Sequence, residues 1–113
     1  MSAEIPRLLI TAGDPAGIGP ELCLKIALES WSSEIIVVAD PILLQQYADL
    51  LCIDIKLVLW SPSAPRSVHQ PGILKVLAVE LKEKVVPGRL SIANAHYVIE
   101  TLSKATEQIL LKN

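Results

Sequence analysis

The sequence has few cysteines, no phenylalanine and little net charge, and these shortages narrow the classes of protein to consider. Its two cysteines, Cys23 and Cys52, stand alone without the CxxC spacing of metal or redox sites. Reduced, buried thiols in a cytoplasmic protein are therefore expected. The formal net charge at pH 7 is −2, and no basic stripe is present, which argues against a nucleic-acid partner.

Long apolar runs are also missing. Stretches such as Ile35–Ala39 and Leu57–Trp60 fall far short of the ~20 apolar residues that a membrane span needs. The first residues lack a basic segment followed by a long apolar one, so no signal peptide and no membrane partner are expected. The chain is nevertheless apolar, with a mean hydropathy of +0.47. We therefore expect apolar surface that a partner, another domain or a missing segment covers.

Short apolar runs alternate with marked helix starts. Nearly continuous apolar runs suit strands buried on both faces of a parallel sheet, and three are predicted: Arg7–Thr11, Glu34–Ala39 and Ile55–Trp60. A largely buried helix is expected from Pro20 to about Ser30, and a second from Pro41 to about Leu51 with Asp40 as its cap. This order predicts a βαβαβ unit with right-handed crossovers, half of a doubly wound sheet.

The remaining residues complete one predicted domain, residues 1–113. Residues 61–72 contain three prolines and are expected to form a loop in which His69 is solvated. Ile73–Val79 is read as a strand or an extended arm. Ser91 is expected to cap a long helix reaching Lys112. One apolar stripe of that helix would face the core, with Tyr97 pointing away from it: Ile92, Ala95, Val98, Ile99, Leu102, Ala105, Ile109 and Leu110.

The segment Thr11–Glu21 (TAGDPAGIGPE) is a glycine-rich turn from a strand into a helix. Its glycines are expected to permit positive φ and to let a ligand approach the backbone. The helix start offers free N–H groups for a phosphate or carboxylate. The spacing is neither that of a P-loop nor GxGxxG. A tight connection that needs glycines only for its shape remains an equal alternative, and Asp14 either lies near a ligand or forms an Asx turn.

The same segment carries a family resemblance. Gly13–Glu21 (GDPAGIGPE) resembles the amino-terminal signature of the 4-hydroxythreonine-4-phosphate dehydrogenase family. Asn94–Leu102 is similar to that family's first long helix, and Val37–Asp40 to its second strand and turn. GIGPE is also similar to the isocitrate and isopropylmalate dehydrogenase group, which shares the fold. The resemblance implies a truncated α/β fold of that type, with a mostly parallel sheet and helices on both faces, and a much longer parent protein.

The family's activity is NAD-dependent oxidation and decarboxylation of 4-phosphooxy-L-threonine to 3-amino-2-oxopropyl phosphate, in pyridoxal phosphate biosynthesis. The resemblance implies NAD, a divalent metal such as zinc acting as a Lewis acid, a small phosphorylated substrate and a homodimer. It assigns cofactor binding only to the glycine loop: Gly13, Asp14, Ala16, Gly17, Ile18 and Gly19. No position matches the family's metal-binding histidines, its substrate-binding His-Thr pair or its basic phosphate-binding residues. We therefore assign no catalytic or metal residue, and expect neither activity nor tight cofactor binding from the chain alone.

Two other hypotheses stay open. The chain could be a small non-enzymatic α/β module that binds an anion or a nucleotide at a helix start. It could instead be a remnant that packs against a partner chain. In a βαβ scheme the long last helix leads back to another parallel strand, and none follows before Asn113, so we expect a truncated domain.

Overall fold

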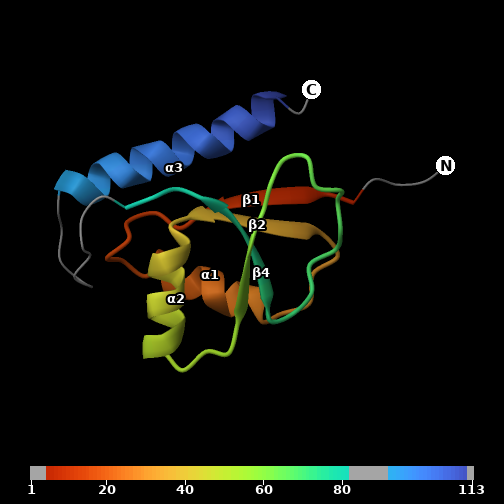
Figure 1. Cartoon of the computed structure of the whole chain (residues 1–113), viewed down its shortest axis with the longest axis horizontal. Helices are drawn as coiled ribbons and strands as arrows, with labels where there is room; N and C mark the ends of the chain where they lie inside the picture. The colour runs from red at the N-terminus through yellow and green to blue at the C-terminus, as the bar shows by residue number, and fades with distance from the viewer. Residues whose placement is uncertain (1–4, 82–91, 112–113) are drawn as a thin grey trace.

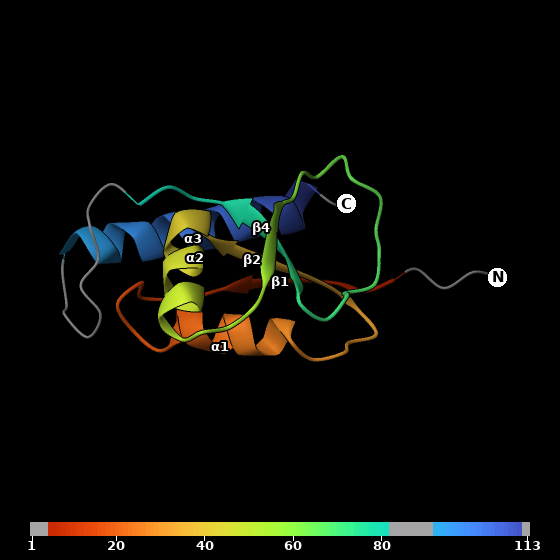
Figure 2. The same cartoon turned by 60° about the horizontal axis from the view of Figure 1, so that its bottom comes forward.

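The computed structural model describes residues 5–81 and 92–111, with side chains left out for residues 92, 93 and 109–111. A four-stranded, wholly parallel sheet lies between helices on both faces (Figures 1 and 2). The elements are β1 (Arg7–Thr11), α1 (Gly19–Ala27), β2 (Glu34–Ala39), α2 (Pro41–Leu50), β3 (Lys56–Leu59), β4 (Ile73–Ala78) and α3 (Ile92–Leu111). Helices α1 and α2 pack on one face, and α3 covers β1 and β2 on the other. The predicted parallel α/β fold is confirmed.

The strand order is β1-β2-β4-β3, so the fourth strand lies between the second and the third. The segment read as a strand or an extended arm is therefore a central strand. It pairs in parallel with β2 from Lys75 to Ala78 and with β3 from Ile73 to Val76. Parallel neighbours need a crossover, and residues 60–72 make this one without a helix.

Helix starts follow the sequence signals closely. Proline occupies the first turn of both α1 and α2. The Asp40 carboxylate accepts the N–H of Ile42 at 2.8 Å, which confirms the predicted cap. Helix α1 ends earlier than expected, at Ala27. Of its nine residues only Pro20, Cys23, Leu24 and Ala27 are buried, so the prediction of a largely buried helix was wrong.

One of the two cysteines, Cys52 after the end of α2, is not buried as expected. Cys52 is exposed, whereas Cys23 is buried in the core as predicted. Cys52 adopts φ 57°, the left-handed conformation that often ends a helix. Its N–H donates to the Asp49 carbonyl at 3.3 Å, and the N–H of Ile53 donates to the Ala48 carbonyl at 2.8 Å. Cys52 therefore terminates the helix and turns its side chain to solvent.

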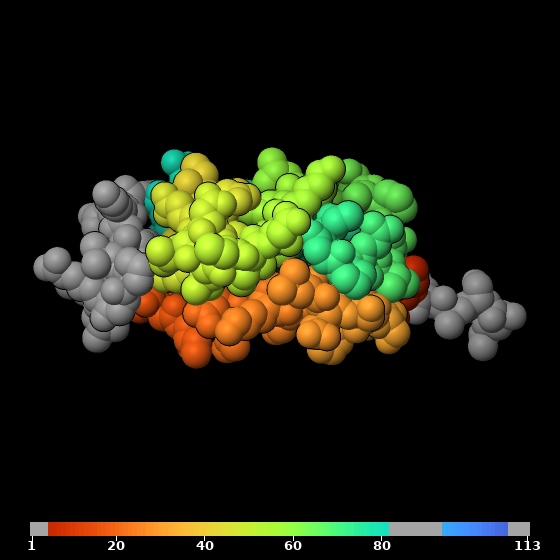
Figure 3. Space-filling model, turned by 90° about the horizontal axis from the view of Figure 1, so that it is seen from below, coloured from red at the N-terminus to blue at the C-terminus, as the bar shows by residue number. Residues whose placement is uncertain are grey.

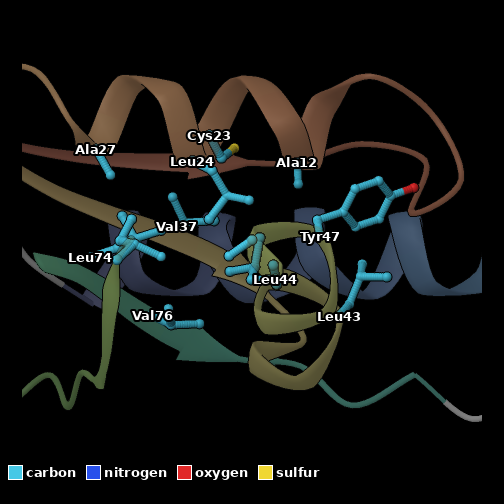
Figure 4. Packing of buried hydrophobic residues seen from close by; sticks show 13 residues of the cluster. Ala12, Cys23, Leu24, Ala27, Val37, Leu43, Leu44, Tyr47, Leu74 and Val76 are labelled. Atoms are coloured by element: carbon cyan, nitrogen blue, oxygen red, sulfur yellow. The ribbon is translucent and has the colours of Figure 1, made fainter. Parts of the chain in front are cut away.

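The main core lies between the sheet and the α1–α2 layer. In Figure 4, Leu24 of α1, Leu44 of α2 and Leu74 of β4 meet there, and all three are fully buried. From outside, α1 and α2 lie against each other and close this face of the molecule (Figure 3). A smaller cluster on the opposite face joins Val38 and Val79 to Tyr97 and Ala105 of α3. Each face of the sheet thus has its own apolar layer.

Helix α3 presents a different face to the sheet than the apolar stripe predicts. Asn94, Tyr97, Thr101 and Ala105 are buried, whereas Ile99 and Leu102 are 62% and 50% exposed. The prediction of a core-facing stripe is confirmed at Ala105 and wrong at Ile99 and Leu102, and the prediction that Tyr97 points away from the core was wrong. Hydrogen bonds explain this orientation of the helix. Its start is turned so that Asn94 and Tyr97 hydrogen-bond to the turns after β1 and β2.

A buried carboxylate holds the crossover at the amino ends of the strands. Glu34 is fully buried and forms ion pairs with Arg7 and with Lys75, the latter at 2.6 Å. It also accepts the N–H of Ser67 from the crossover at 3.2 Å. Burial by itself raises the pKa of Glu34, but hydrogen bonds from Lys75, Arg7 and Ser67 outweigh it and leave the pKa below its ordinary value.

His69 belongs to the same crossover and is buried rather than solvated. Its backbone N–H donates to the Ser33 carbonyl at 3.0 Å, and its Nε2 lies 2.7 Å from the carbonyl oxygen of Ala27 at the end of α1. The Ala27 carbonyl also accepts the N–H of Gly72 at 2.9 Å, so two residues of the crossover meet the end of α1 at one oxygen.

Candidate functional site

The glycine loop lies at the carboxyl end of β1 and leads directly into α1. In parallel α/β sheets, ligands bind outside the carboxyl ends of the strands. The start of α3 lies at the same end of the molecule (Figure 1). Asn94 of α3 reaches Asp14 of the loop, which joins the two segments despite their separation in the sequence. All six predicted cofactor-binding residues are therefore on one short loop at the expected edge.

The glycines have different roles. Gly13 has φ +73°, and nothing lies within 4 Å of the position of a Cβ atom there. A Cβ on Gly19 would lie 1.6 Å from the Ala12 carbonyl oxygen. Gly19 is thus explained by the close approach of α1 to the end of β1. The prediction of positive φ is confirmed for Gly13 and wrong for Gly17 and Gly19.

Asp14 forms the predicted Asx turn. Its carboxylate oxygen Oδ1 accepts the N–H of Ala16 at 2.8 Å, and its carbonyl accepts the N–H of Gly17 at 2.9 Å. The same Oδ1 accepts a longer bond from Asn94 at 3.3 Å. The Asp14 carboxylate and the N–H of Ala16 are therefore bonded to each other within the loop.

The loop has a buried half and an exposed half. Pro15 and Ala16 are buried, whereas Gly17 and Ile18 are exposed, Ile18 at 68%. The side chain of Ala16 therefore lies beneath the loop. Gly17 and Ile18 are the predicted residues that face solvent, and the N–H of Gly17 is bonded to the Asp14 carbonyl.

The start of α1 is open to an anion. Ile18 is the N-cap, and no side chain of the described residues caps this end. The first N–H groups of a helix have no partner within the helix and lie at the positive end of its dipole. Glu21 adds a negative charge to the first turn, but it is paired with Lys25 at 2.9 Å. The geometry suits one phosphate or carboxylate group of a larger ligand.

Two tyrosines support this edge, and sequence reasoning missed both. Tyr47 of α2 donates its hydroxyl to the Pro15 carbonyl at 2.9 Å. Tyr97 of α3 accepts the N–H of Asp40 at 2.7 Å. Burial raises the pKa of Tyr97 to about 12. Burial also raises the pKa of Tyr47, with smaller contributions from the nearby charges of Asp14 and Glu21. Both hydroxyls therefore stay protonated at neutral pH.

Asp40 joins the turn after β2 to the segment after β4. One carboxylate oxygen caps α2, and the other accepts the N–H of Leu81 at 2.7 Å. The backbone N–H of Asp40 donates to the Tyr97 hydroxyl, which holds the start of α3 close to the sheet. The sequence indicated only the cap, because Leu81 and Tyr97 are distant along the chain.

Within residues 5–81 and 92–111, no group of three histidine, cysteine, aspartate or glutamate side chains is arranged to hold a metal ion. His69 is a buried residue of the crossover, and His96 is exposed on α3. Among the helices described, none is both long enough and apolar enough to cross a membrane.

Comparison with known proteins identifies relatives. No family model matches the chain. It is 43% identical over 101 residues to 4-hydroxythreonine-4-phosphate dehydrogenases from Yersinia pseudotuberculosis and Yersinia pestis. That match covers 89% of this chain but 30% of each relative, so the chain spans less than a third of their length.

Solved structures show the same fold. A crystal structure of 4-hydroxythreonine-4-phosphate dehydrogenase from Klebsiella pneumoniae matches 96% of this chain and 34% of its own, with a TM-score of 0.82 at 24% identity. The Burkholderia phymatum protein of the same name matches 93% of this chain and 33% of its own, with a TM-score of 0.79 at 22% identity. Sequence and fold agree: over most of its length the chain is similar to 4-hydroxythreonine-4-phosphate dehydrogenases, and it covers 30% of the length of those relatives.

Proposed function

We propose that this chain supplies the glycine-loop part of an NAD-dependent 4-hydroxythreonine-4-phosphate dehydrogenase. The reaction would be oxidation and decarboxylation of 4-phosphooxy-L-threonine to 3-amino-2-oxopropyl phosphate, in pyridoxal phosphate biosynthesis. The observation that supports it is 43% identity over 101 residues to enzymes of that name. The site of a cytoplasmic homodimer, as the family resemblance implies, would be completed by residues beyond those of this chain.

The role proposed for the described residues is to receive an anionic group of NAD, which accepts the hydride when bound. The open start of α1 provides backbone N–H groups beside the exposed residues Gly17 and Ile18. This arrangement fits a phosphate of the cofactor. These residues would bind and orient the cofactor, and none of them is proposed to take part in the chemistry.

The described residues do not fit the divalent metal that the family resemblance implies. They offer no group of three side chains at ligand distance. We therefore assign no step to a metal in this part of the protein, and expect its ligands elsewhere in a whole enzyme.

A second candidate is a non-enzymatic α/β module that binds an anion or a nucleotide. The uncapped start of α1 favours it, because that feature needs no further domain. The two proposals differ in one respect: only the first requires this chain to support turnover when it replaces the matching part of a relative.

A chimaeric enzyme tests that difference. The matching segment of the Yersinia pseudotuberculosis enzyme is replaced by this chain, and NADH formation is followed with 4-phosphooxy-L-threonine. Turnover well above that of the enzyme lacking its segment would support the dehydrogenase proposal. A folded chimaera that binds NAD without turnover would favour the binding module, and one without either property would contradict both.

Substitution of Ile18 tests the binding role of the loop. Ile18 has helical φ and ψ, so aspartate at this position acts through its charge at the positive end of α1, which should stabilise the helix by roughly 0.3–1 kcal/mol. The same charge should repel an anionic ligand at this place. Ile18→Asp is therefore expected to raise the KM for NAD in the chimaera without lowering thermal stability. Ile18→Asn is the matched control, because asparagine has nearly the same shape without a charge. Equal KM values for the two variants would place the cofactor elsewhere.

A further inference from the structure

The glycine loop is held from both faces of the sheet by two side chains that sequence analysis did not assign to the site. Tyr47 reaches it from α2 and donates to the Pro15 carbonyl at 2.9 Å. Asn94 reaches it from α3 and donates to Asp14 Oδ1 at 3.3 Å. Helices α2 and α3 lie on opposite faces of the sheet, so the loop is supported from two directions.

We propose that Tyr47 is a positioning residue which, together with Asn94, sets the conformation of the Gly13–Gly19 loop and so the direction of the first N–H groups of α1. The ligand assigned to those groups rests on the proposed function. The positioning itself does not, because it follows from contacts within the chain.

Core packing alone does not explain Tyr47. Its ring belongs to the main cluster with Leu43 and Ala48, and the residue is only 8% exposed. A phenylalanine ring would fill the same space. The hydroxyl is the added feature, and a buried tyrosine hydroxyl needs a hydrogen-bond partner. Figure 4 shows it pointing from α2 toward the loop between β1 and α1.

The partner of that hydroxyl is equally informative. Pro15 is fully buried and has no N–H group, so its carbonyl is its one backbone hydrogen-bonding group. A buried carbonyl without a partner destabilises the conformation that contains it. The raised pKa of Tyr47 keeps the proton that this bond requires. The bond therefore favours the conformation in which Pro15 points inward and Gly17 and Ile18 point outward.

Asn94 acts on the other half of the turn. Asp14 Oδ1 accepts both the N–H of Ala16 and the amide of Asn94. The first of these bonds closes the Asx turn, and the second ties that turn to the start of α3. A displacement of α3 would thus act on the same oxygen atom that shapes the loop.

Amide hydrogen exchange in the full chain tests the positioning. Tyr47→Phe should keep the core packing and remove one bond to the loop. Exchange at Ala16 and Gly17, whose N–H groups donate within the loop, should become about two- to tenfold faster, the range for loss of one net hydrogen bond. Amides of β2 serve as the internal reference for global stability. Tyr97→Phe is the matched control, because it removes a hydroxyl bond at the same edge that does not touch the loop.

Unchanged loop exchange in Tyr47→Phe, or equal acceleration in Tyr97→Phe, would overturn the proposal. A second measurement separates the positioning role of Tyr47 from the proposed function. In the chimaera, Tyr47→Phe should raise the KM for NAD more than it lowers kcat, because the loop meets the cofactor and not the reacting atoms. Faster loop exchange with an unchanged KM would support positioning by Tyr47 and contradict the cofactor site.

Discussion

Replacing Gly19 with alanine tests whether close packing, rather than backbone freedom, explains the last glycine of the loop. The added Cβ would lie 1.6 Å from the Ala12 carbonyl oxygen and 2.7 Å from its carbon. Both neighbours are backbone atoms of the residue that follows β1, so no side-chain rotation relieves the overlap. Helix α1 has to move away from β1, and Cys23, Leu24 and Ala27 move with it out of the core.

The loss of stability expected for Gly19→Ala follows from that displacement. Overpacking a core costs ~1–3 kcal/mol, and a clash between two backbone segments belongs at or above the upper end. At about 4–8 °C per kcal/mol for a domain of this size, the midpoint of thermal unfolding should fall by roughly 12 °C or more.

Two neighbouring glycines provide internal controls. Alanine at Gly13 meets no atom within 4 Å, but it is forced to φ +73°, which costs ~1–2 kcal/mol. Alanine at Gly17 has ordinary φ and a contact of 3.3 Å with the Asp14 carbonyl oxygen, so a loss of about 0.5 kcal/mol is expected.

Thermal and urea unfolding of the three variants, followed by circular dichroism, gives the ranking directly. The expected order of destabilisation is Gly19→Ala, then Gly13→Ala, then Gly17→Ala. If Gly19→Ala is no more destabilised than Gly17→Ala, the argument from close packing is wrong.

Three further predictions concern other parts of the chain. The lowered pKa of Glu34 means that its ionised form contributes stability above the ordinary carboxyl value of 4.5, and that this contribution is lost as the pH falls through the lower folded-state pKa. Glu34→Gln, which leaves Arg7 and Lys75 without their counter-charge, should cost about 3 kcal/mol at neutral pH and weaken the acid dependence of urea unfolding; an unchanged pH profile would contradict this. Cys52→Gly should raise stability by up to about 1 kcal/mol in urea unfolding, since glycine adopts the left-handed conformation without strain, and a destabilised variant would refute it. The full chain should associate in size-exclusion chromatography through its exposed apolar residues, and Leu102→Lys on α3 should reduce this association, whereas a wild-type monomer would disprove the expectation.

Most of the elements were predictable because their signals are local. Proline in the first turn of α1 and the Asp40 cap act within a few residues, through fixed φ and one side-chain bond. Short apolar runs placed three of the four strands, whereas the segment of β4 was read as a strand or an extended arm and not recognised as central. The Asx turn of Asp14 likewise depends on two neighbouring residues. The six predicted loop residues were found together because they are contiguous.

What the sequence could not reveal depends on partners far along the chain. Strand β4 inserts between β2 and β3 because a crossover without a helix returns it there. Tyr97 faces inward because Asp40, 57 residues away, supplies a backbone donor. His69 is buried because its ring meets the end of α1, which periodicity in its own segment does not indicate.

The candidate site divides in the same way. The amino-acid sequence by itself determined where the glycine loop lies, since a strand, a turn and a proline-marked helix start are all encoded within Thr11–Glu21. Only the tertiary structure decided which half of that loop faces outward. Tyr47 and Asn94 bring hydrogen-bond donors to it from opposite faces of the sheet, 32 and 80 residues away from their partners. Such bonds form only once the chain has folded, because a buried carbonyl and a partly buried carboxylate bond to the donors that the surrounding elements place beside them.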